Sequence, residues 1–291
     1  MPEWFFSFPE KIFINIRDPI DQAIQYILVH WDSFFKGLTK FLRWLLKTIG
    51  NGISWIPWWG IIVLVFLATW KTTKKLSRAA LYSVLIFVIG TLGLWELMIQ
   101  TLTIIITAVI ISLLLGLPLG VLSASNKRID KVVRPVLDMM QTMPSFVYLI
   151  PAVMLMGLGS VPAVIATTIY SLPPVIRLTS LGLQQVDTEV MEAAKSFGST
   201  RFQTLFKVQI PQAMPTIMTG VNQTMMMAIA MVVTCSMIAA PGLGDEVIKG
   251  INRLESGRGF AAGIAIVILA IVMDRLTQGI YEDDEKSIAA E

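Results

Sequence analysis

The stretch EAAKSFGSTRFQTLFKVQIPQAMP, from Glu192 to Pro215, is the longest polar-rich passage in the middle of an apolar chain. It predicts two short helices joined at a glycine. Asp187 supplies a side-chain oxygen to cap the first helix, and Gly198 is placed to end it in a left-handed conformation. Ser199 is expected to cap the second helix. A short capped helix between two apolar segments suits insertion into a groove on a partner protein, and an ordinary loop is the alternative.

The composition around this stretch indicates an integral membrane protein. Of the 291 residues, 55% are hydrophobic and 15% are charged, and the mean hydropathy is +0.70. Soluble domains carry roughly 25% charged residues. The net charge of +3 argues against nucleic acid as a partner, and one Cys with one His excludes an internal disulfide and a His/Cys metal cluster. No cleaved signal peptide is expected, because no short basic region leads into an apolar stretch at the start.

Seven apolar runs approach or exceed the length that crosses a bilayer, which takes about 20 helical residues. The expected fold is therefore all-α, with about seven transmembrane helices in a membrane domain over residues 53–281. The runs are Ile53–Trp70, Ala79–Leu97, Ile99–Leu122, Pro135–Leu158, Val161–Leu183, Thr216–Ala240 and Ala261–Leu276. Prolines within or near them predict bent helices around a path; these are Pro118, Pro144, Pro151, Pro173 and Pro174.

Residues 1–52 form a separate N-terminal segment. From Trp31 onward, apolar residues recur at the i, i+3, i+4 and i+7 positions of one helix face. The basic residues on the other side are Lys36, Lys40, Arg43 and Lys47. A basic amphipathic helix with aromatic residues is typical of the membrane interface. A helix packed on a partner domain is the alternative, and the two roles are compatible.

The distribution of Lys and Arg predicts the orientation in the membrane. Three basic loops fall on the cytoplasmic side; their residues are Lys71, Lys74, Lys75 and Arg78, then Lys127, Arg128, Lys131 and Arg134, then Arg177, Lys195, Arg201 and Lys207. With seven spans the N-terminus lies outside, and the acidic tail over 282–291 lies in the cytoplasm. If the first run is not a span, the N-terminus lies inside with six spans. The stretch 192–215 is cytoplasmic in both arrangements.

The spacing within the polar stretch matches a known motif. Glu192-Ala193-Ala194, three residues, Gly198, nine residues and then Val208-Gln209-Ile210-Pro211 resemble the "EAA" signature of ABC importer permeases. The family pattern is Glu-Ala-Ala, three residues, Gly, nine residues, Ile-x-Leu-Pro. Val208 and Ile210 are mild departures from this pattern, and the spacing agrees throughout.

Three further stretches resemble one subgroup of that family. They are Met143–Tyr148, Ile238–Gly244 and Ile266–Gln278. The subgroup is the glycine betaine/proline betaine permeases, which import quaternary ammonium osmolytes. The resemblance extends over about residues 80–280.

The resemblance implies a type I ABC importer permease fold in a bacterial inner membrane, with this chain as the pore-forming subunit of an ATP-driven, binding-protein-dependent importer. It implies a second copy of the chain, two ATP-binding subunits docked on a coupling segment over 187–211, an external substrate-binding protein and surrounding lipid. The coupling residues that match the motif are Glu192, Ala193, Ala194, Gly198, Val208, Ile210 and Pro211. The chain has no Gly-x-x-x-x-Gly-Lys-Ser/Thr phosphate loop, so we expect no enzymatic activity of its own, and ATP with Mg²⁺ on the partner ATPases.

Side chains for a substrate path follow from the chemistry of a quaternary ammonium, which has no hydrogen-bond donors and is held by aromatic rings. The candidates are Phe146, Tyr148 and Tyr170, with Met225, Met226 and Met227 as soft walls. Helix-to-helix packing is the alternative role of each. Charged residues near helix ends are expected to pair or to anchor at the interface; they are Asp138, Arg177, Asp274 and Arg275. Residues 245–254 are expected to form a short external helix, or a loop along the membrane surface.

Other functions stay open at the level of the sequence. Choline, carnitine or an amino acid such as methionine would fit the same architecture. An ATP-independent channel or a secondary transporter is the more distant alternative. That class would require charges at the membrane midplane or paired broken helices as inverted repeats, and neither is evident.

Overall fold

The structure, a computed structural model, describes residues 15–288, with side chains through Gly279. These residues form helices and no strand, as expected for an all-α membrane protein. The helices are α1 (Arg17–His30), α2 (Asp32–Trp55), α3 (Trp58–Thr73), α4 (Leu76–Thr91), α5 (Trp95–Ser125), α6 (Lys127–Thr142), α7 (Leu149–Met156), α8 (Ser160–Gln184), α9 (Thr188–Ser196), α10 (Arg201–Thr204), α11 (Ile210–Thr234), α12 (Leu243–Asn252) and α13 (Ser256–Ile288). Short helical turns join some of them; these are η3 (Ser145–Tyr148), η4 (Leu205–Gln209) and η5 (Cys235–Ile238).

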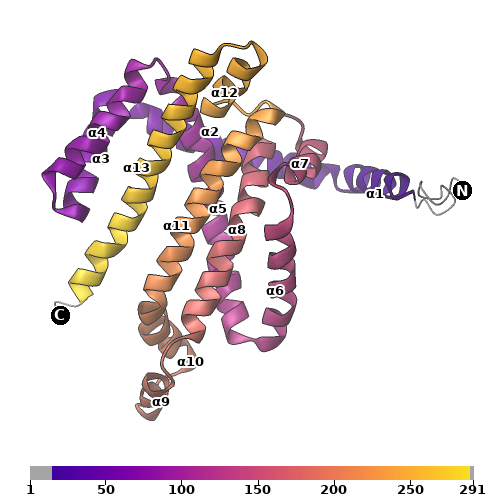
Figure 1. Cartoon of the computed structure of the whole chain (residues 1–291). Coiled ribbons are helices and arrows are strands. Elements are labelled where there is room, and N and C mark those ends of the chain that lie inside the picture. The colour runs from indigo at the N-terminus through magenta and orange to yellow at the C-terminus, as the bar shows by residue number, and fades with distance from the viewer. Residues whose placement is uncertain (1–14, 289–291) are drawn as a thin grey trace, which may run out of the picture.

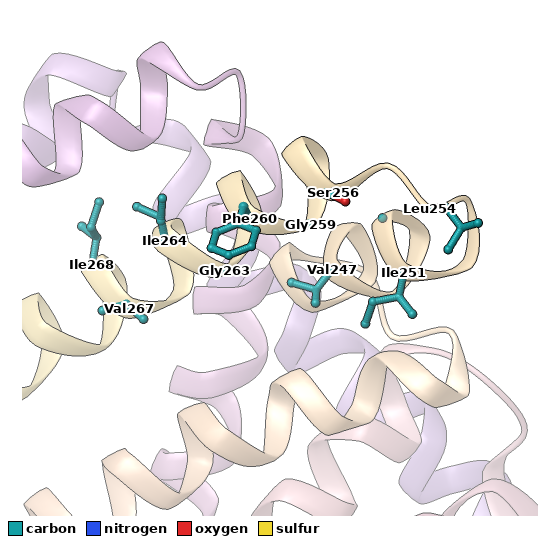
Figure 2. Close-up of a pocket in the computed structure, with 11 residues that line it drawn as sticks. Val247, Ile251, Leu254, Ser256, Gly259, Phe260, Gly263, Ile264, Val267 and Ile268 are labelled. Carbon is teal, nitrogen blue, oxygen red and sulfur yellow. The ribbon is translucent and has the colours of Figure 1, made fainter.

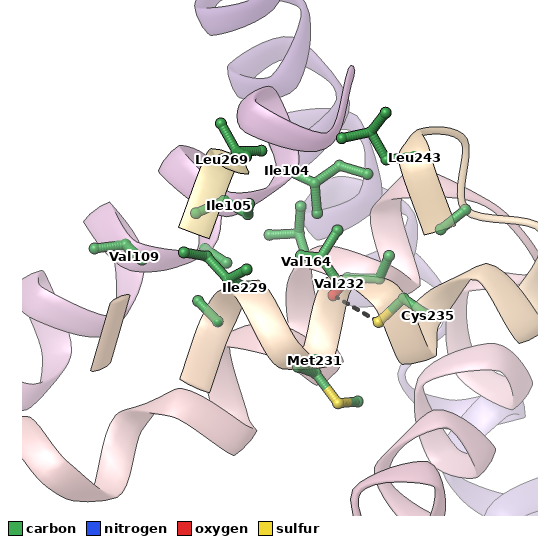
Figure 3. Packing of buried hydrophobic residues seen from close by; sticks show 14 of the residues in the cluster. Ile104, Ile105, Val109, Val164, Ile229, Met231, Val232, Cys235, Leu243 and Leu269 are labelled. Carbon is green, nitrogen blue, oxygen red and sulfur yellow. Dashed lines mark hydrogen bonds between the residues drawn. The ribbon is translucent and has the colours of Figure 1, made fainter. Parts of the chain in front are cut away.

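Four long helices, α5, α8, α11 and α13, form the centre of the molecule (Figure 1). Their facing sides bury a cluster of aliphatic residues that includes Ile105 of α5, Val164 of α8 and Ile229 of α11, drawn in Figure 3. α9 lies beyond one end of this bundle, and α12 caps the other end (Figure 1). The coupling segment is therefore carried by the two central helices α8 and α11.

Small residues let α8 approach its two neighbours closely. A Cβ atom on Gly120 of α5 would lie 2.6 Å from the Thr179 Cβ and 2.9 Å from the Ile176 carbonyl oxygen of α8. A Cβ atom on Gly220 of α11 would lie 3.0 Å from the Leu178 Cβ, on the same helix α8. Inside a bilayer helices associate by such close packing, since lipid tails are as apolar as the side chains they compete with.

The expected fourth span, Pro135–Leu158, is not one straight helix. α6 and the pair η3–α7 are bent by 110° at their junction. Proline disfavours the α conformation at the preceding residue, and Met143 before Pro144 is extended, with φ −74° and ψ 132°. The helices α5 and α8, in contrast, continue through Pro118 and through Pro173–Pro174. Of these prolines, Pro144 is the one at a break, and the residue before it, Met143, has an extended conformation.

The count of seven spans is not confirmed. Within the described residues, four helices are long and apolar enough to cross a membrane, and two bent pairs bring the number to six if each pair is one span. The second expected span, placed at Ala79–Leu97, was wrong at its end: α4 stops at Thr91, and Gly93 with φ +73° makes the turn into α5. Glu96 and Gln100 therefore lie within the first turns of α5.

The amphipathic N-terminal helix is present as α2, preceded by the helix α1. Leu42 is buried on the core, while Phe41 and Trp44 are more than half exposed. The helix continues past residue 52 and meets α3 at a bend of 89°. The first expected run, Ile53–Trp70, is therefore divided at Ile56–Pro57 between the end of α2 and the helix α3.

At the other terminus α13 runs through residue 281 without a break.

Replacing Gly120 with valine tests the close approach of α5 and α8. The added atoms would meet the backbone of α8, so we expect a loss of about 1–3 kcal/mol in the free energy of unfolding, measured by thermal unfolding in detergent. Gly263→Val is the control, because nothing lies within 4 Å of a Cβ atom at that position. Equal loss in both variants would contradict the packing described here.

Candidate functional site

The coupling segment begins with a short helix that is capped at both ends. The Asp187 side chain accepts a hydrogen bond from the Glu189 backbone N–H at 2.9 Å, which fixes the start of α9. At the other end Gly198 has φ +78°, and the backbone N–H of Ser199 donates to the Ala194 carbonyl at 3.1 Å. This is the left-handed termination that the sequence predicts. A Cβ atom at Gly198 would meet nothing within 4 Å, so lack of space does not explain the glycine. The positive φ is what favours glycine there.

The second part of the segment differs from the sequence prediction at its cap. Thr200, not Ser199, caps α10: its hydroxyl accepts from the Gln203 N–H, and the Gln203 side chain accepts from the Thr200 N–H. This reciprocal capping box gives hydrogen-bond acceptors to two backbone N–H groups, those of Thr200 and Gln203. The second helix is not a separate short element, because α10 passes at Leu205 into the π-helical turn η4 and then without a break into α11. A π turn within a helix is frequent at functional sites.

The motif residues divide between a free surface and the bundle. Glu192 and Ala193 are exposed, while Ala194 is half-buried. Val208 is half-buried in η4, and Pro211 is exposed at the start of α11. Ile210, at the start of α11, packs on a small buried cluster of Leu183, Ala213 and Ile217. The exposed half is thus anchored to the ends of α8 and α11.

Three phenylalanines that the sequence analysis missed dominate the outer surface of the coupling segment. Phe197 is 90% exposed, Phe202 72% and Phe206 52%. The rings of Phe202 and Phe206 are in contact, with centroids 4.5 Å apart and planes tilted by 39°. Exposed aromatic side chains gathered at one place mark a surface for another protein or a membrane. Their presence in an otherwise polar stretch is the sequence signal that could have found them.

The aromatic candidates for the substrate path do not form one cage. Tyr148 is buried, its hydroxyl donates to the Met140 carbonyl oxygen across the α6–η3 break, and its ring makes an edge contact with Tyr170 at 5.9 Å. Phe146 is 55% exposed and makes no ring contact with either tyrosine within the described residues. The observed contacts of Tyr148 are structural. Its role in a path stays a prediction.

The three methionines point in different directions. Met225 packs on the main hydrophobic cluster, Met226 is 39% exposed and Met227 is half-buried. Consecutive residues of an α-helix are about 100° apart around the axis, so the three cannot line one wall together. The role of Met225, Met226 and Met227 as walls of the substrate path stays a prediction.

The charged residues near the helix ends pair, as expected. Arg177 of α8 forms an ion pair with Asp138 of α6. Asp274 of α13 accepts a hydrogen bond from the Asn222 side chain of α11 at 3.0 Å. Charged side chains at membrane depth face the bundle interior and pair with one another. These contacts join α6 to α8 and α11 to α13.

Comparisons with known proteins identify the family. A model described as a binding-protein-dependent transport system inner membrane component matches residues 116–282, which include the whole coupling segment. The glycine betaine transport system permease protein OpuAB of Bacillus subtilis is 43% identical, over 92% of this chain and 94% of that protein. The glycine betaine/proline betaine transport system permease protein ProW of Escherichia coli is 42% identical, over 94% of this chain and 77% of that protein.

This chain belongs to the binding-protein-dependent transport system inner membrane components. Solved structures agree with the fold. The inward-facing MetNI methionine ABC transporter matches with a TM-score of 0.54 at 20% identity, over 66% of this chain and 93% of that chain. The crystal structure of an amino acid ABC transporter with histidines matches with a TM-score of 0.52 at 26% identity, over 64% of this chain and 89% of that chain.

The family assignment confirms the expected class. The chain is an inner membrane component of a binding-protein-dependent transport system, with several helices long and apolar enough to cross a membrane. Its relatives OpuAB and ProW are named as permease proteins of transport systems. The matched segment 116–282 contains α8, α9 and most of the bundle that holds them.

The end of this inner membrane component opposite α9 is a compact corner of α12 and α13. The expected external helix is present as α12, and a Cβ atom on its Gly250 would lie 2.6 Å from the backbone nitrogen of Gly259. Outside the corner the two helices leave an apolar groove of about 720 Å³, lined by residues such as Ile251, Phe260 and Ile264 (Figure 2). The backbones of α12 and α13 are thus in contact at Gly250 and Gly259, while an apolar groove lies on the outer side of the two helices.

One buried carboxylate holds this corner together. Glu246 of α12 accepts hydrogen bonds from Arg258 of α13 and from Lys249 at 3.1 Å. The Arg258 guanidinium, with help from Lys249, holds the pKa of the Glu246 carboxyl below its usual range and outweighs the opposite effect of burial. Lys249 also pairs with Asp245 at 2.7 Å, and these two acids raise the pKa of the lysine.

A pH dependence follows from the lowered pKa of Glu246. Its ionised form stabilises the folded state above the ordinary carboxyl pKa of 4.5, and that contribution is lost as the pH falls through the lower folded value. We expect Glu246→Gln to cost about 1–3 kcal/mol at neutral pH and to lose less on acidification than the wild type, in thermal unfolding. The control is Glu255→Gln, a more exposed partner of Arg258. Parallel pH profiles for wild type and Glu246→Gln would contradict the pairing.

Proposed function

We propose that this chain forms the pore of an ATP-driven importer of glycine betaine and proline betaine-type osmolytes. The observation that carries the proposal is the rigid, doubly capped α9 with its exposed aromatic neighbours Phe197, Phe202 and Phe206, built on the motif at Glu192–Gly198. The substrate follows from relatives: a glycine betaine/carnitine transport permease protein, GbuB of Listeria monocytogenes, is 45% identical over 86% of this chain and 90% of that protein. OpuAB and ProW carry glycine betaine in their names as well.

The working assembly holds two copies of this chain, two ATP-binding subunits and an external binding protein, within the lipid of a bacterial inner membrane. Each ATPase receives one α9 in a surface groove, with the motif residues of the coupling segment at the contact. ATP and Mg²⁺ bind on the ATPases. Closure of the ATPases moves the docked helices and opens the path outward to receive the osmolyte. ATP hydrolysis then returns the transporter to its starting conformation. A helix capped at both ends suits this role because a contact that transmits force must not unwind.

The same assembly fixes the orientation. If the ATPases dock at α9, that end of the bundle is cytoplasmic, and α12 lies outside. The N-terminal helix α2 packs near the α12 end (Figure 1), which agrees with an external N-terminus. The C-terminal part of α13 then lies on the cytoplasmic side.

Related amines are the alternative substrates. A carnitine transport permease protein of Listeria monocytogenes and a choline transport system permease protein of Bacillus subtilis match over 60% of this chain at 33% and 32% identity. An amino acid such as methionine is more distant, since the methionine transporter resembles this chain in fold at 20% identity. No observation favours an ATP-independent channel.

Uptake of labelled glycine betaine tests the proposal. Vesicles would hold this chain, its co-expressed ATPase and its binding protein, and would be loaded with or without ATP. ATP-dependent uptake of glycine betaine supports both class and substrate. ATP hydrolysis without uptake of glycine betaine would move the substrate to choline or carnitine. Uptake that is equal without ATP would contradict the coupled mechanism.

Two substitutions test the coupling segment directly. Glu192→Lys reverses an exposed charge on α9, and Gly198→Val places a branched residue at φ +78°, where L-residues are disfavoured by roughly 1–2 kcal/mol. We expect both proteins to reach the membrane in normal amounts and to lose at least tenfold in ATP-driven uptake, about the effect of 1.4 kcal/mol. Co-purification of the ATPase measures the docking itself.

Matched controls lie at the other end of the bundle. Glu255→Lys reverses an exposed charge, and Gly257→Val replaces a glycine whose Cβ position is free of contacts. Both should retain the ATPase on purification. Full retention and full ATP-driven uptake in the α9 variants would remove the coupling role from this segment.

A further inference from the structure

A small polar pocket lies between α3, α4 and α13, away from the coupling segment. Its volume is about 270 Å³, and its lining residues are Thr73, Arg78, Tyr82, Arg275, Gln278 and Gly279. It sits near the end of α13 that is remote from α12. None of the functions described above uses these residues.

The pocket carries positive charge. Arg78 comes from α4 and Arg275 from α13, and no lining residue is acidic. The Arg275 guanidinium donates to Gln278 at 3.1 Å, and its Nε lies 3.8 Å from an oxygen of Asp274. The other oxygen of Asp274 is occupied by hydrogen bonds from Asn222 and Gln278. Among the described side chains Arg78 makes no ion pair, and the lining of the pocket carries two positive charges.

The walls of the pocket are fixed by close packing. A Cβ atom on Gly279 would lie 2.6 Å from the Thr72 hydroxyl oxygen, so α13 and α3 are in contact at its floor. The Thr73 hydroxyl donates to the Thr69 carbonyl at 2.8 Å and is held in place. Tyr82 lies one helical turn after Arg78 on α4 and adds a hydroxyl to the same face. Two guanidinium groups with a phenol are donors suited to a phosphate group.

The surroundings of the pocket are those of a membrane boundary. Leu76, Leu81 and Val84 on α4 are each more than half exposed. Lys74 and Lys75 are exposed in the turn that joins α3 to α4. Apolar side chains that face lipid thus adjoin a basic pocket within one or two helical turns, the arrangement by which pockets between transmembrane helices hold lipid headgroups.

We propose that this pocket binds the phosphate of an anionic phospholipid, whose acyl chains lie on the exposed apolar side chains of α4. Arg78 and Arg275 contact the phosphate, and Tyr82 completes the site. Assignment of the lipid to the cytoplasmic leaflet rests on the proposed function, which places α9 on that side. Binding itself does not depend on transport, so the two proposals fail separately.

Native mass spectrometry of the purified full chain measures the binding without ATP or ATPase. The probes are phosphatidylglycerol, which is anionic, and phosphatidylcholine with the same acyl chains, which is zwitterionic. We expect the wild type to prefer phosphatidylglycerol by about tenfold or more, and Arg78→Gln/Arg275→Gln to lose that preference. Arg78→Lys/Arg275→Lys, which keeps the charge and loses the planar guanidinium, should be intermediate and also shows that a substituted pocket still folds.

The matched control is Lys127→Gln/Arg128→Gln, which removes two exposed basic residues at the start of α6. It should keep the preference for phosphatidylglycerol. Loss of preference in this control as large as in the pocket variant, or no preference in the wild type, would overturn the site. Displacement of the lipid by inorganic phosphate at comparable concentration would overturn the lipid as the source of the phosphate.

Discussion

Close backbone contact between α8 and its neighbours is the constraint on which the rest of the structure depends. Helices in a bilayer have no water to exclude from one another, so they associate by packing and polar contacts. Gly120 of α5 and Gly220 of α11 place their backbones against α8, and a Cβ atom on Gly182 of α8 would lie 3.0 Å from Thr216 of α11. The end of α8 and the start of α11 are thereby fixed. The coupling segment between them is a short span held at both ends, not a free loop.

This placement explains why one part of the coupling segment is packed on the bundle while the other part is exposed. Ile210 and the cluster of Leu183, Ala213 and Ile217 anchor it to the bundle. The caps at Asp187 and Gly198 keep α9 intact while its outer surface stays exposed. In the proposed assembly, push or pull on α9 by the ATPase would be transmitted to α8 and α11, which pack at the centre of the bundle. The ion pair between Asp138 and Arg177 extends the same connection to α6.

Much of this site could be predicted from the sequence, because caps and terminating glycines act through neighbouring residues. Asp187 and Gly198 have the expected roles for that reason. The cap of α10 went to Thr200 and not Ser199, since two adjacent hydroxyl residues offer the same local chemistry and only Thr200 has its reciprocal partner Gln203. The break at Pro144 could not be told from the uninterrupted passage of α8 through Pro173, because hydropathy does not record whether neighbours satisfy the freed backbone groups. The exposure of Phe202 depends on tertiary placement, and the sequence signals it only through an aromatic residue in a polar stretch.

The most direct test of the central claim is a cross-link from α9 to the ATPase. The chain has a single cysteine, Cys235, which is buried, so one engineered cysteine gives an unambiguous partner. Ala193→Cys on exposed α9 would be treated with a short thiol-to-amine cross-linker in the assembled complex, beside Ile251→Cys on α12 at the opposite end. The structure predicts a cross-link to the ATPase from residue 193 only, with a yield that changes when ATP is added. A cross-link from residue 251, or none from residue 193, would contradict the account of how this membrane component is driven.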